Sequence, residues 1–285
     1  MTSENEIKVH PLTKNPSAAW ESFKPKQTAF RIKHLPIDLP VSHKAIRFVC
    51  MSDTHSLLSR RKFKIPPGDV FIHAGDFTRH GGYNEIIEFN NFLGNLSHKH
   101  KIVIAGNHEL TFDQKTISSF EIKQAKKATG QDVPLDTAYF KNLLTNCVYL
   151  EDSLTEVYNI KIYGTPWQPE YNNWAFNLPR GKECLEKWNM IPSGIDVLIT
   201  HTPPVGHGDL CILGRRVGCV ELLQTVQNRI KPKYHVFGHI HEVMWNKIRE
   251  TIILYICSGR NGWGHWKKEF SEEPVELVSF IIIGA

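Results

Sequence analysis

The hydrophobic pattern of the first ordered stretch alternates between short apolar runs and one amphipathic segment. Residues 46–51 and 70–73 are apolar runs rich in strand-forming side chains, and the second follows a Pro-Pro-Gly-Asp turn. Residues 83–96 place apolar side chains three and four positions apart, which predicts a helix. Residues 102–105 form a further apolar run. This succession of strand, helix and strand indicates the α/β class.

The second half of the chain continues the alternation but also contains strands that follow one another directly. Such neighbouring strands favour a mixed sheet over a purely parallel one. The further predicted elements are one or two helices within 114–144, interrupted near Gly130 and Pro134, strands at 148–150, 154–157 and 160–163, a loop at 164–180, a helix at 181–190, a strand at 197–200, a helix at 217–230, a strand ending at 236–237, and strands over the last forty residues that pair as hairpins.

The N-terminal region differs in composition from the rest of the chain. Residues 1–43 are polar, carry prolines at positions 11, 16, 25, 36 and 40, and lack a periodic apolar pattern. We therefore divide the chain into an N-terminal extension, 1–43, and one domain, 44–285. The extension either wraps the domain or stays partly loose, and Trp20 and Phe23 are its candidate anchors.

Composition narrows the class of protein without identifying its chemistry. The chain of 285 residues has a net charge of +5, and its Lys and Arg residues are scattered. This distribution favours a solvated surface, or a basic rim around a site for an anionic substrate, over binding of a long nucleic acid. The six cysteines form no CxxC pair, the first 30 residues have no signal core, and the apolar runs are too short to span a bilayer. We expect a cytoplasmic protein without a membrane partner.

Five short polar segments carry the candidate chemistry, and each follows a predicted strand. Because the carboxyl ends of strands meet at one edge of an open α/β sheet, side chains distant in sequence converge there. Carboxylate, imidazole and amide oxygen are ligands for hard or borderline divalent ions. The candidate ligands are Asp53, His55, Asp76, Asn107, His201, His239 and His241.

The spacing within the segments supports a shared metal site. Asp53 and His55 lie two positions apart, so in a strand-like conformation they point to the same side, as do His239 and His241. Asp76 is the best candidate to bridge two ions, because a carboxylate has two oxygens. Taken singly, each segment also fits a plainer interpretation as a helix cap, a turn, a loop or a hydrogen-bonded histidine.

In order along the chain, the motifs DTH, GDF, GNHE, TH and GHIH resemble those of the calcineurin-like metallophosphoesterases. The resemblance implies two mixed β-sheets sandwiched by helices, with a two-metal centre at the strand ends. Purple acid phosphatases carry a tyrosine where this chain has Arg79, and the GDxVDRG motif of the Ser/Thr protein phosphatases is missing. The stretches NNWAFNLPRG, THTPPVGHGD and RVGCVELLQTVQNRIKPKYHVFGHIHE are most similar to the metallophosphoesterase-domain-containing (MPPED) group, which is similar to class III cyclic nucleotide phosphodiesterases.

The resemblance also implies roles for individual residues. One metal would be held by Asp53, His55, Asp76 and His241, and the second by Asp76, Asn107, His201 and His239. His108 would act as general acid or as a donor to the phosphate, which suits an imidazole that titrates near neutral pH. The cofactors would be two divalent ions, with manganese favoured and iron, zinc, magnesium or cobalt as alternatives.

The resemblance implies hydrolysis of 2′,3′- and/or 3′,5′-cyclic nucleotides, by attack of a hydroxide held at the dinuclear centre. The alternatives are a slow-turnover nucleotide-binding sensor or scaffold, and a phosphomonoesterase or nuclease. The expected partner is a small nucleotide; protein partners are not indicated. The candidate substrate contacts are Asn107, His108, Arg180, Arg260 and Asn261. The aromatic loop at 167–176 is interpreted as a packed surface loop, with stacking of Trp174 or Phe176 on a base as the alternative.

Overall fold

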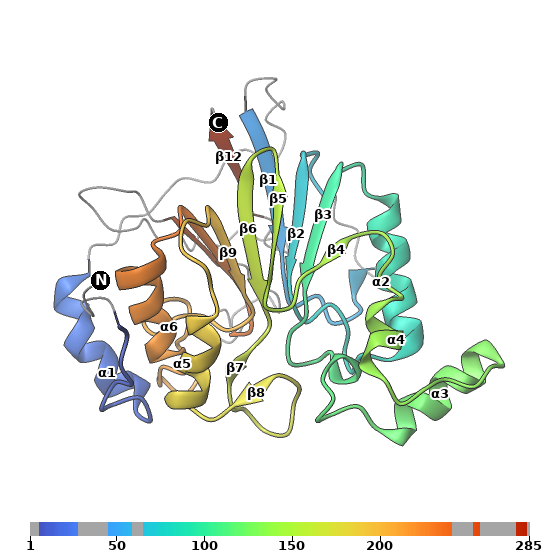
Figure 1. Ribbon diagram of the computed structural model, residues 1–285, viewed down its shortest axis with the longest axis horizontal. Coiled ribbons are helices and arrows are strands. Elements are labelled where there is room, and N and C mark those ends of the chain that lie inside the picture. The colour runs from blue at the N-terminus through green and yellow to red at the C-terminus, as the bar shows by residue number, and fades with distance from the viewer. Residues whose placement is uncertain (1–5, 28–44, 59–64, 241–252, 257–277, 284–285) are drawn as a thin grey trace.

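The computed structural model describes residues 6–27, 45–58, 65–240, 253–256 and 278–283. Two five-stranded sheets form the centre of this part of the chain, and helices cover their outer sides (Figure 1). Helices α2 and α4 lie beside the first sheet, whereas α5 and α6 lie beside the second. The predicted α/β class with two mixed sheets between helices is therefore confirmed.

Both sheets are mixed because each combines parallel strands with antiparallel edge strands. The first has the order β12-β1-β2-β3-β4, in which β1 to β4 are parallel and β12 pairs antiparallel with β1. The second has the order β11-β10-β9-β6-β5, in which β10, β9 and β6 are parallel and both edge strands are antiparallel. The parallel strands of each sheet thus end at a common edge.

Most elements follow the predicted order, but the segment predicted as a loop at 164–180 contains the two-residue strands β7 and β8. The helices are α1 (Pro16–Phe23), α2 (Tyr83–Asn95), α3 (Ser119–Thr129), α4 (Thr137–Lys141), α5 (Lys182–Asn189) and α6 (Val220–Gln224), with short helical turns at Lys24–Lys26, Leu110–Phe112 and Thr225–Ile230. The strands are β1 (Ala45–Met51), β2 (Val70–Ala74), β3 (His100–Ile104), β4 (Val148–Tyr149), β5 (Ser153–Val157), β6 (Ile160–Thr165), β7 (Gln168–Pro169), β8 (Asn177–Leu178), β9 (Val197–Thr200), β10 (Tyr234–Phe237), β11 (Ile253–Ile256) and β12 (Val278–Ile283).

Strand β9 at the centre of the second sheet is buried on both faces, which explains its continuous apolar run. Along β9, Val197 and Ile199 join the core cluster that also contains first-sheet residues, whereas Leu198 packs with the residues of α5 and α6. Successive strand residues point to opposite faces, so alternation divides one apolar run between two cores. Gly164 lets the sheets approach closely, because a Cβ there would lie 2.6 Å from both Ile104 Cγ2 and Leu150 Cβ.

The helix predicted over 217–230 begins later than expected. The amide of Val217 donates to Asp209 O, that of Gly218 to Asp209 Oδ2, and that of Cys219 to Pro203 O. Because these bonds hold the backbone on the preceding loop, α6 starts at Val220 and continues into a π-helical turn, Thr225–Ile230.

The expected hairpin between the late strands is wrong for the part of the chain that the structure describes. Strand β11 extends the second sheet beside β10, whereas β12 joins the first sheet beside β1. Each strand completes a different sheet edge, which removes an unpaired row of backbone groups from β1 and from β10.

The described part of the N-terminal extension packs on the domain and contains a helix that the apolar pattern did not predict. Asn15 caps α1 by accepting from the amide of Ala18, and Pro16 occupies its first position. Trp20 is buried with Val205, and Phe23 packs against the same cluster, which confirms both as anchors. The boundary of the extension at residue 43 remains a prediction.

Substitution of Gly206 tests whether Trp20 anchors the N-terminal extension to the domain. A Cβ at Gly206 would lie 1.9 Å from Trp20 Cζ3, and the residue has a φ of +88°. We expect Gly206→Ala to lower the free energy of unfolding by at least about 2 kcal/mol, since backbone strain and overpacking add.

Gly214→Ala is the matched control, because Gly214 also has a positive φ, +72°, but nothing lies within 4 Å of an added Cβ. Its loss should be about 1 kcal/mol, the cost of backbone strain alone. Urea unfolding measures both variants. Equal losses would show that Trp20 does not hold the loop containing Gly206.

Candidate metal centre

The predicted ligand segments lie in tight turns that follow the parallel strands. Asp53, His55, Asp76 and His239 all adopt positive φ values, of 54°, 44°, 57° and 75°. This left-handed conformation is costly for residues with a Cβ and persists only where surrounding contacts enforce it. The strand-like geometry expected for Asp53 and His55 is therefore wrong: the chain has left β1 and turns sharply at each of them.

Hydrogen bonds between backbones hold these turns together. At the ends of β1 and β2, the amide of Asp53 donates to Gly75 O at 2.9 Å, and that of His55 to Asp76 O at 3.0 Å. At the ends of β9 and β10, the amide of Gly238 donates to His201 O at 3.1 Å. Each sheet thus brings two neighbouring ligand turns into register.

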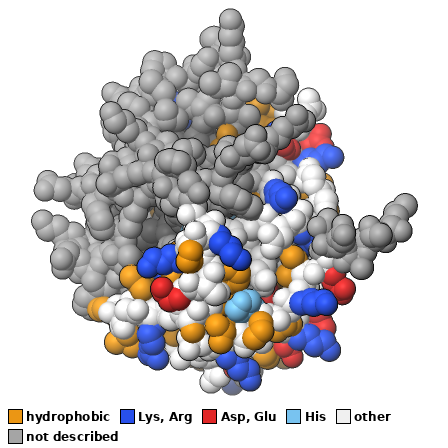
Figure 2. Space-filling model, turned by 90° about the vertical axis from the view of Figure 1, so that its left-hand side faces the viewer, with side chains coloured by type: hydrophobic (Ala, Val, Ile, Leu, Met, Phe, Trp, Pro, Cys, Tyr) orange, Lys and Arg blue, Asp and Glu red, His pale blue; other side chains and the backbone are white. Residues whose placement is uncertain are grey.

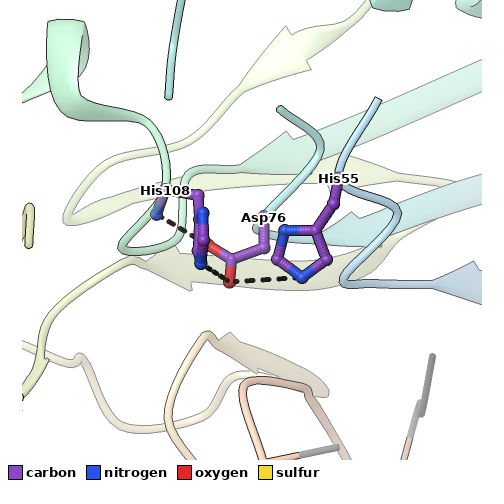
Figure 3. Close-up of side chains that lie close together, drawn as sticks. All are labelled: His55, Asp76 and His108. Carbon is purple, nitrogen blue, oxygen red and sulfur yellow. Dashed lines mark hydrogen bonds and ion pairs between the residues drawn. The ribbon is translucent and has the colours of Figure 1, made fainter. Parts of the chain in front are cut away.

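Asp76 lies at the centre of the site, and histidines from both sheets surround its carboxylate. His201 Nε2 lies 3.3 Å from Asp76 Oδ2, while the Nε2 atoms of His108 and His55 lie 3.9 and 4.0 Å from the same oxygen. Figure 3 shows His55 and His108 flanking this carboxylate, each from a different loop.

Asp76 belongs to two groups of close ligand atoms. One group consists of His55, Asp76 and His108, and the other of Asp76, His201 and His239. Within each group the ligand atoms lie within 4.8 Å of one another. His55 and His108 of one group and His201 of the other approach the same oxygen, Asp76 Oδ2, while Oδ1 accepts from the amide of His108 at 2.9 Å. A carboxylate oxygen with two lone pairs suits a bridging position between two ions.

Backbone carbonyls orient two of these imidazoles. His201 Nδ1 donates to Ala74 O at 2.9 Å, and His108 Nδ1 donates to Arg79 O at 2.7 Å. In each case Nε2 faces the Asp76 carboxylate. A histidine that donates its other ring proton to a carbonyl is the usual arrangement for metal ligation.

The buried charges at the centre are strongly coupled. Burial opposes ionisation of Asp76, but the adjacent His201 and the other histidines hold the pKa of its carboxyl well below the usual value. Burial likewise opposes the imidazolium of His201, but Asp76 raises its pKa to about 9. Without a metal, a proton on His201 therefore compensates the Asp76 charge, and a cation would replace that proton.

Glu109 organises the loops around Asp76 although it is not itself in either ligand group. Its carboxylate is fully buried and accepts from the amides of Asp76, Thr78 and Gly106 and from the Thr78 hydroxyl, at 2.6 to 2.9 Å. Burial, and then the Asp76 charge, raise the pKa of Glu109, while these donors oppose the shift. Sequence reasoning left Glu109 without a role, and its place in the GNHE motif was the available signal.

Two motif glycines are required because their backbone lies very close to the carboxylates of candidate ligands. A Cβ on Gly106 would lie 2.3 Å from Asp76 Oδ1, and one on Gly238 would lie 2.2 Å from Asp53 Oδ2. Neither position has space for a side chain. These glycines therefore belong to the site as much as the ligands they precede.

The remaining predicted ligands take different places. Asn107 Oδ1 lies 3.1 Å from His201 Nε2, so its amide oxygen faces the second group. Asp53 lines the site, but its two carboxylate oxygens accept from the amide of His239 at 3.0 and 3.1 Å, and it joins neither group. His241 lies outside the described residues.

The predicted substrate contacts are distributed unevenly. Arg180 donates to the carbonyls of Val217 and Gly218 and so stabilises the loop before α6. Phe176 is buried and packs edge-on against Trp167, which does not leave it free to stack on a base. Trp174 lies against the ring of His108, with centroids 4.2 Å apart. Arg260 and Asn261 lie outside the described residues.

The donors present fit divalent metal ions. They are imidazole nitrogens, a central carboxylate and an amide oxygen, without a thiolate, a set that hard and borderline ions accept. The shared carboxylate and the carbonyl-oriented imidazoles are further features of built metal sites.

A family model and several known proteins match this chain. Residues 46–243 match the family model described as Calcineurin-like phosphoesterase. The chain is 47% identical over 249 residues to UPF0046 protein T07D4.2 of Caenorhabditis elegans, covering 84% of this chain and 62% of that protein. It is 48% identical over 246 residues to human Metallophosphoesterase domain-containing protein 1, covering 83% and 74%. A solved structure of TT1561 from Thermus thermophilus matches with 11% identity and a TM-score of 0.41, covering 66% and 79%.

The family match covers more than half of the chain and includes all the motif segments up to residue 241. Family membership supports a phosphoesterase hydrolase that uses divalent metal ions. The sequence motifs, the fold and the cluster around Asp76 thus agree with the family model, and the chain belongs to the calcineurin-like phosphoesterase family.

Proposed function

We propose that the protein is a metal-dependent phosphodiesterase that hydrolyses small cyclic nucleotides with two divalent ions, manganese being the favoured metal. The observation that carries the proposal is the shared carboxylate of Asp76, which lies within both groups of ligand atoms. His55 belongs to one group, His201 and His239 belong to the other, and Asn107 adds an oxygen to the second. Asp53 and His241 complete the proposed set.

When bound, divalent ions at these positions would neutralise phosphate charge and lower the pKa of water. The residues of the chain would then orient the ester and manage its protons. His108 suits proton donation, because its Nδ1–H is held by Arg79 O and its Nε2 faces the centre. Its side chain is 24% exposed, so a substrate oxygen has access to it. A proton on Nε2 would pass to the departing alkoxide.

Two aromatic side chains from the loop between β7 and β8 stand beside the centre. Trp174 contacts His108, and Tyr171, which is 55% exposed, lies 6.2 Å from the His239 ring. The amide of Ala175 donates to Asn107 O, which ties this loop to a ligand turn. Aromatic rings at the rim suit a planar base attached to the phosphate.

The alternatives fit the structure less well. A sensor without turnover would need the metal ligands but no partly exposed imidazole placed to give a proton to a substrate oxygen, as His108 is. A nuclease for long chains would use a continuous basic surface. On the face shown in Figure 2, the described Lys and Arg side chains are separated by hydrophobic and polar ones.

Within the described residues, the helices are too short or too polar to cross a membrane.

Substitutions of Asp76 and His108 separate metal binding from chemistry. Asp76→Ala should lose paired metal binding, because both groups share this carboxylate. His108→Ala should retain the metals but lower kcat by about 10²- to 10⁴-fold, the usual contribution of a general acid. Hydrolysis of 2′,3′- and 3′,5′-cyclic AMP by the manganese-loaded protein, together with metal analysis, measures both effects.

His100→Ala is the control, because His100 begins β3, at the opposite end of this strand from the ligand turn. It should retain wild-type rates. Wild-type turnover in His108→Ala would remove that residue from the mechanism. A wild-type protein that binds both metals and nucleotide but hydrolyses neither ring would favour the sensor.

Substitution of Trp174 tests whether this side chain recognises the base of the nucleotide. Trp174→Ala should raise KM for a cyclic nucleotide about tenfold, in line with the stacking energy of one base. It should leave KM for methyl p-nitrophenyl phosphate within about twofold, and Trp174→Phe should largely restore nucleotide binding. A fall in kcat on both substrates with unchanged KM values would instead show that Trp174 only positions His108.

A further inference from the structure

Two buried threonine–histidine pairs lie directly behind the ligand turns. Thr54 Oγ1 lies 3.1 Å from His73 Nε2, and Thr200 Oγ1 lies 2.8 Å from His235 Nε2. All four side chains are at most 1% exposed. Neither His73 nor His235 is among the candidate residues that the sequence motifs indicated.

The two pairs occupy equivalent places in the two sheets. Thr54 stands between the candidate ligands Asp53 and His55 after β1, and His73 lies on the neighbouring strand β2, which leads to Asp76. In the second sheet, Thr200 ends β9 immediately before His201, and its partner His235 lies on the neighbouring strand β10, which leads to His239. The first pair therefore joins the turn after β1 to strand β2, and the second joins strand β9 to strand β10.

The direction of the hydrogen bond is defined in the second pair. Thr200 Oγ1 donates to Thr202 O at 2.7 Å, so its lone pair accepts from His235 Nε2–H. Burial lowers the pKa of His235 to about 3, and of His73 likewise to about 3, so both imidazoles are neutral at physiological pH. These two hydrogen bonds connect His235 to Thr200 and Thr200 to Thr202. Thr200 and Thr202 are the residues on either side of His201.

Neither histidine is itself a candidate ligand. His73 and His235 are absent from both close groups of ligand atoms among the described residues. Their Nδ1 atoms are buried, and the described residues offer them no hydrogen-bond partner. The burial of two polar rings in this manner costs free energy, and the bond to threonine is the compensation that the structure shows.

We propose that the two Thr–His pairs are positioning residues, each of which sets the affinity of one metal. The Thr54–His73 pair would govern the metal at Asp53, His55 and Asp76, and the Thr200–His235 pair the metal at Asn107, His201 and His239. The inference rests on the two-metal centre of the proposed function. Residues that orient ligands without touching the metal typically change its affinity by about 10- to 100-fold.

The test is a titration of the metal-free full chain with Mn²⁺ by calorimetry, with electron paramagnetic resonance to distinguish single from paired ions. Thr54→Val and Thr200→Val keep the side-chain shape and remove the hydroxyl. We expect each to weaken a different binding step by about tenfold or more and to leave the other step within about twofold. Thr54→Ser and Thr200→Ser keep the hydroxyl and should bind both ions as the wild type does.

Thr225→Val is the matched control, because Thr225 is also fully buried but its hydroxyl has no hydrogen-bond partner within the described residues. It should leave both steps unchanged. The proposal is overturned if the Thr54 and Thr200 variants bind metal like Thr225→Val, or if either lowers both steps equally.

The serine variants keep the test decisive if a valine variant fails to fold. Weakened metal binding in a folded serine variant would assign the effect to loss of methyl packing and would overturn the proposal. Because the readout is metal affinity, failure of the proposed phosphodiesterase activity would not affect the result. A chain that binds two ions and cleaves no cyclic nucleotide would lose the proposed function and still test the pairs.

Discussion

The contact of the buried Asp76 carboxylate with imidazoles from both sheets is the interaction on which the rest of the site depends. His55 and His108 reach it from the first sheet, and His201 reaches it from the second. A carboxylate in this position is costly unless positive charge or hydrogen bonds compensate it. The two sheets therefore have to meet where their parallel strands end. Gly164 does not lie in the site, but it contributes to it because it lets the two sheets approach closely.

Precise placement of the ligands comes from strained turns that neighbouring groups enforce. Four candidate ligands have left-handed backbones, a conformation that a free peptide with side chains seldom adopts. Backbone bonds between adjacent turns and the four donors converging on Glu109 provide the compensation. Strain concentrated where ligands converge is a common property of functional sites.

The structure also divides the site into parts with separate tasks. His201 and His108, whose Nδ1 atoms bond to carbonyls, present Nε2 to the centre, whereas His73 and His235 lie behind it and bond to threonines. Trp174 and Tyr171 reach the rim from a loop that the apolar pattern identified only as irregular. The candidate ligands, the residues behind them and the aromatic rim thus come from different segments of the chain.

Much of the fold and of the candidate site was accessible from the amino-acid sequence alone. Apolar periodicity located β1, β2, α2 and β9, because side-chain burial on one or two faces imposes a period that local sequence records. Residue types after each strand indicated the chemistry, because hard or borderline ions require oxygen and imidazole ligands.

The sequence did not determine how those ligands are arranged. Which sheet β11 and β12 join, the direction in which Asp53 points, and the role of Glu109 all depend on groups distant in the chain. The left-handed turns at Asp53, His55, Asp76 and His239 also depend on tertiary contacts, because Asp and His tolerate this conformation more often than other residues but rarely adopt it. Residue identity thus determined which chemistry is available, and only the tertiary structure decided which atoms meet, because convergence comes from the packing of two sheets.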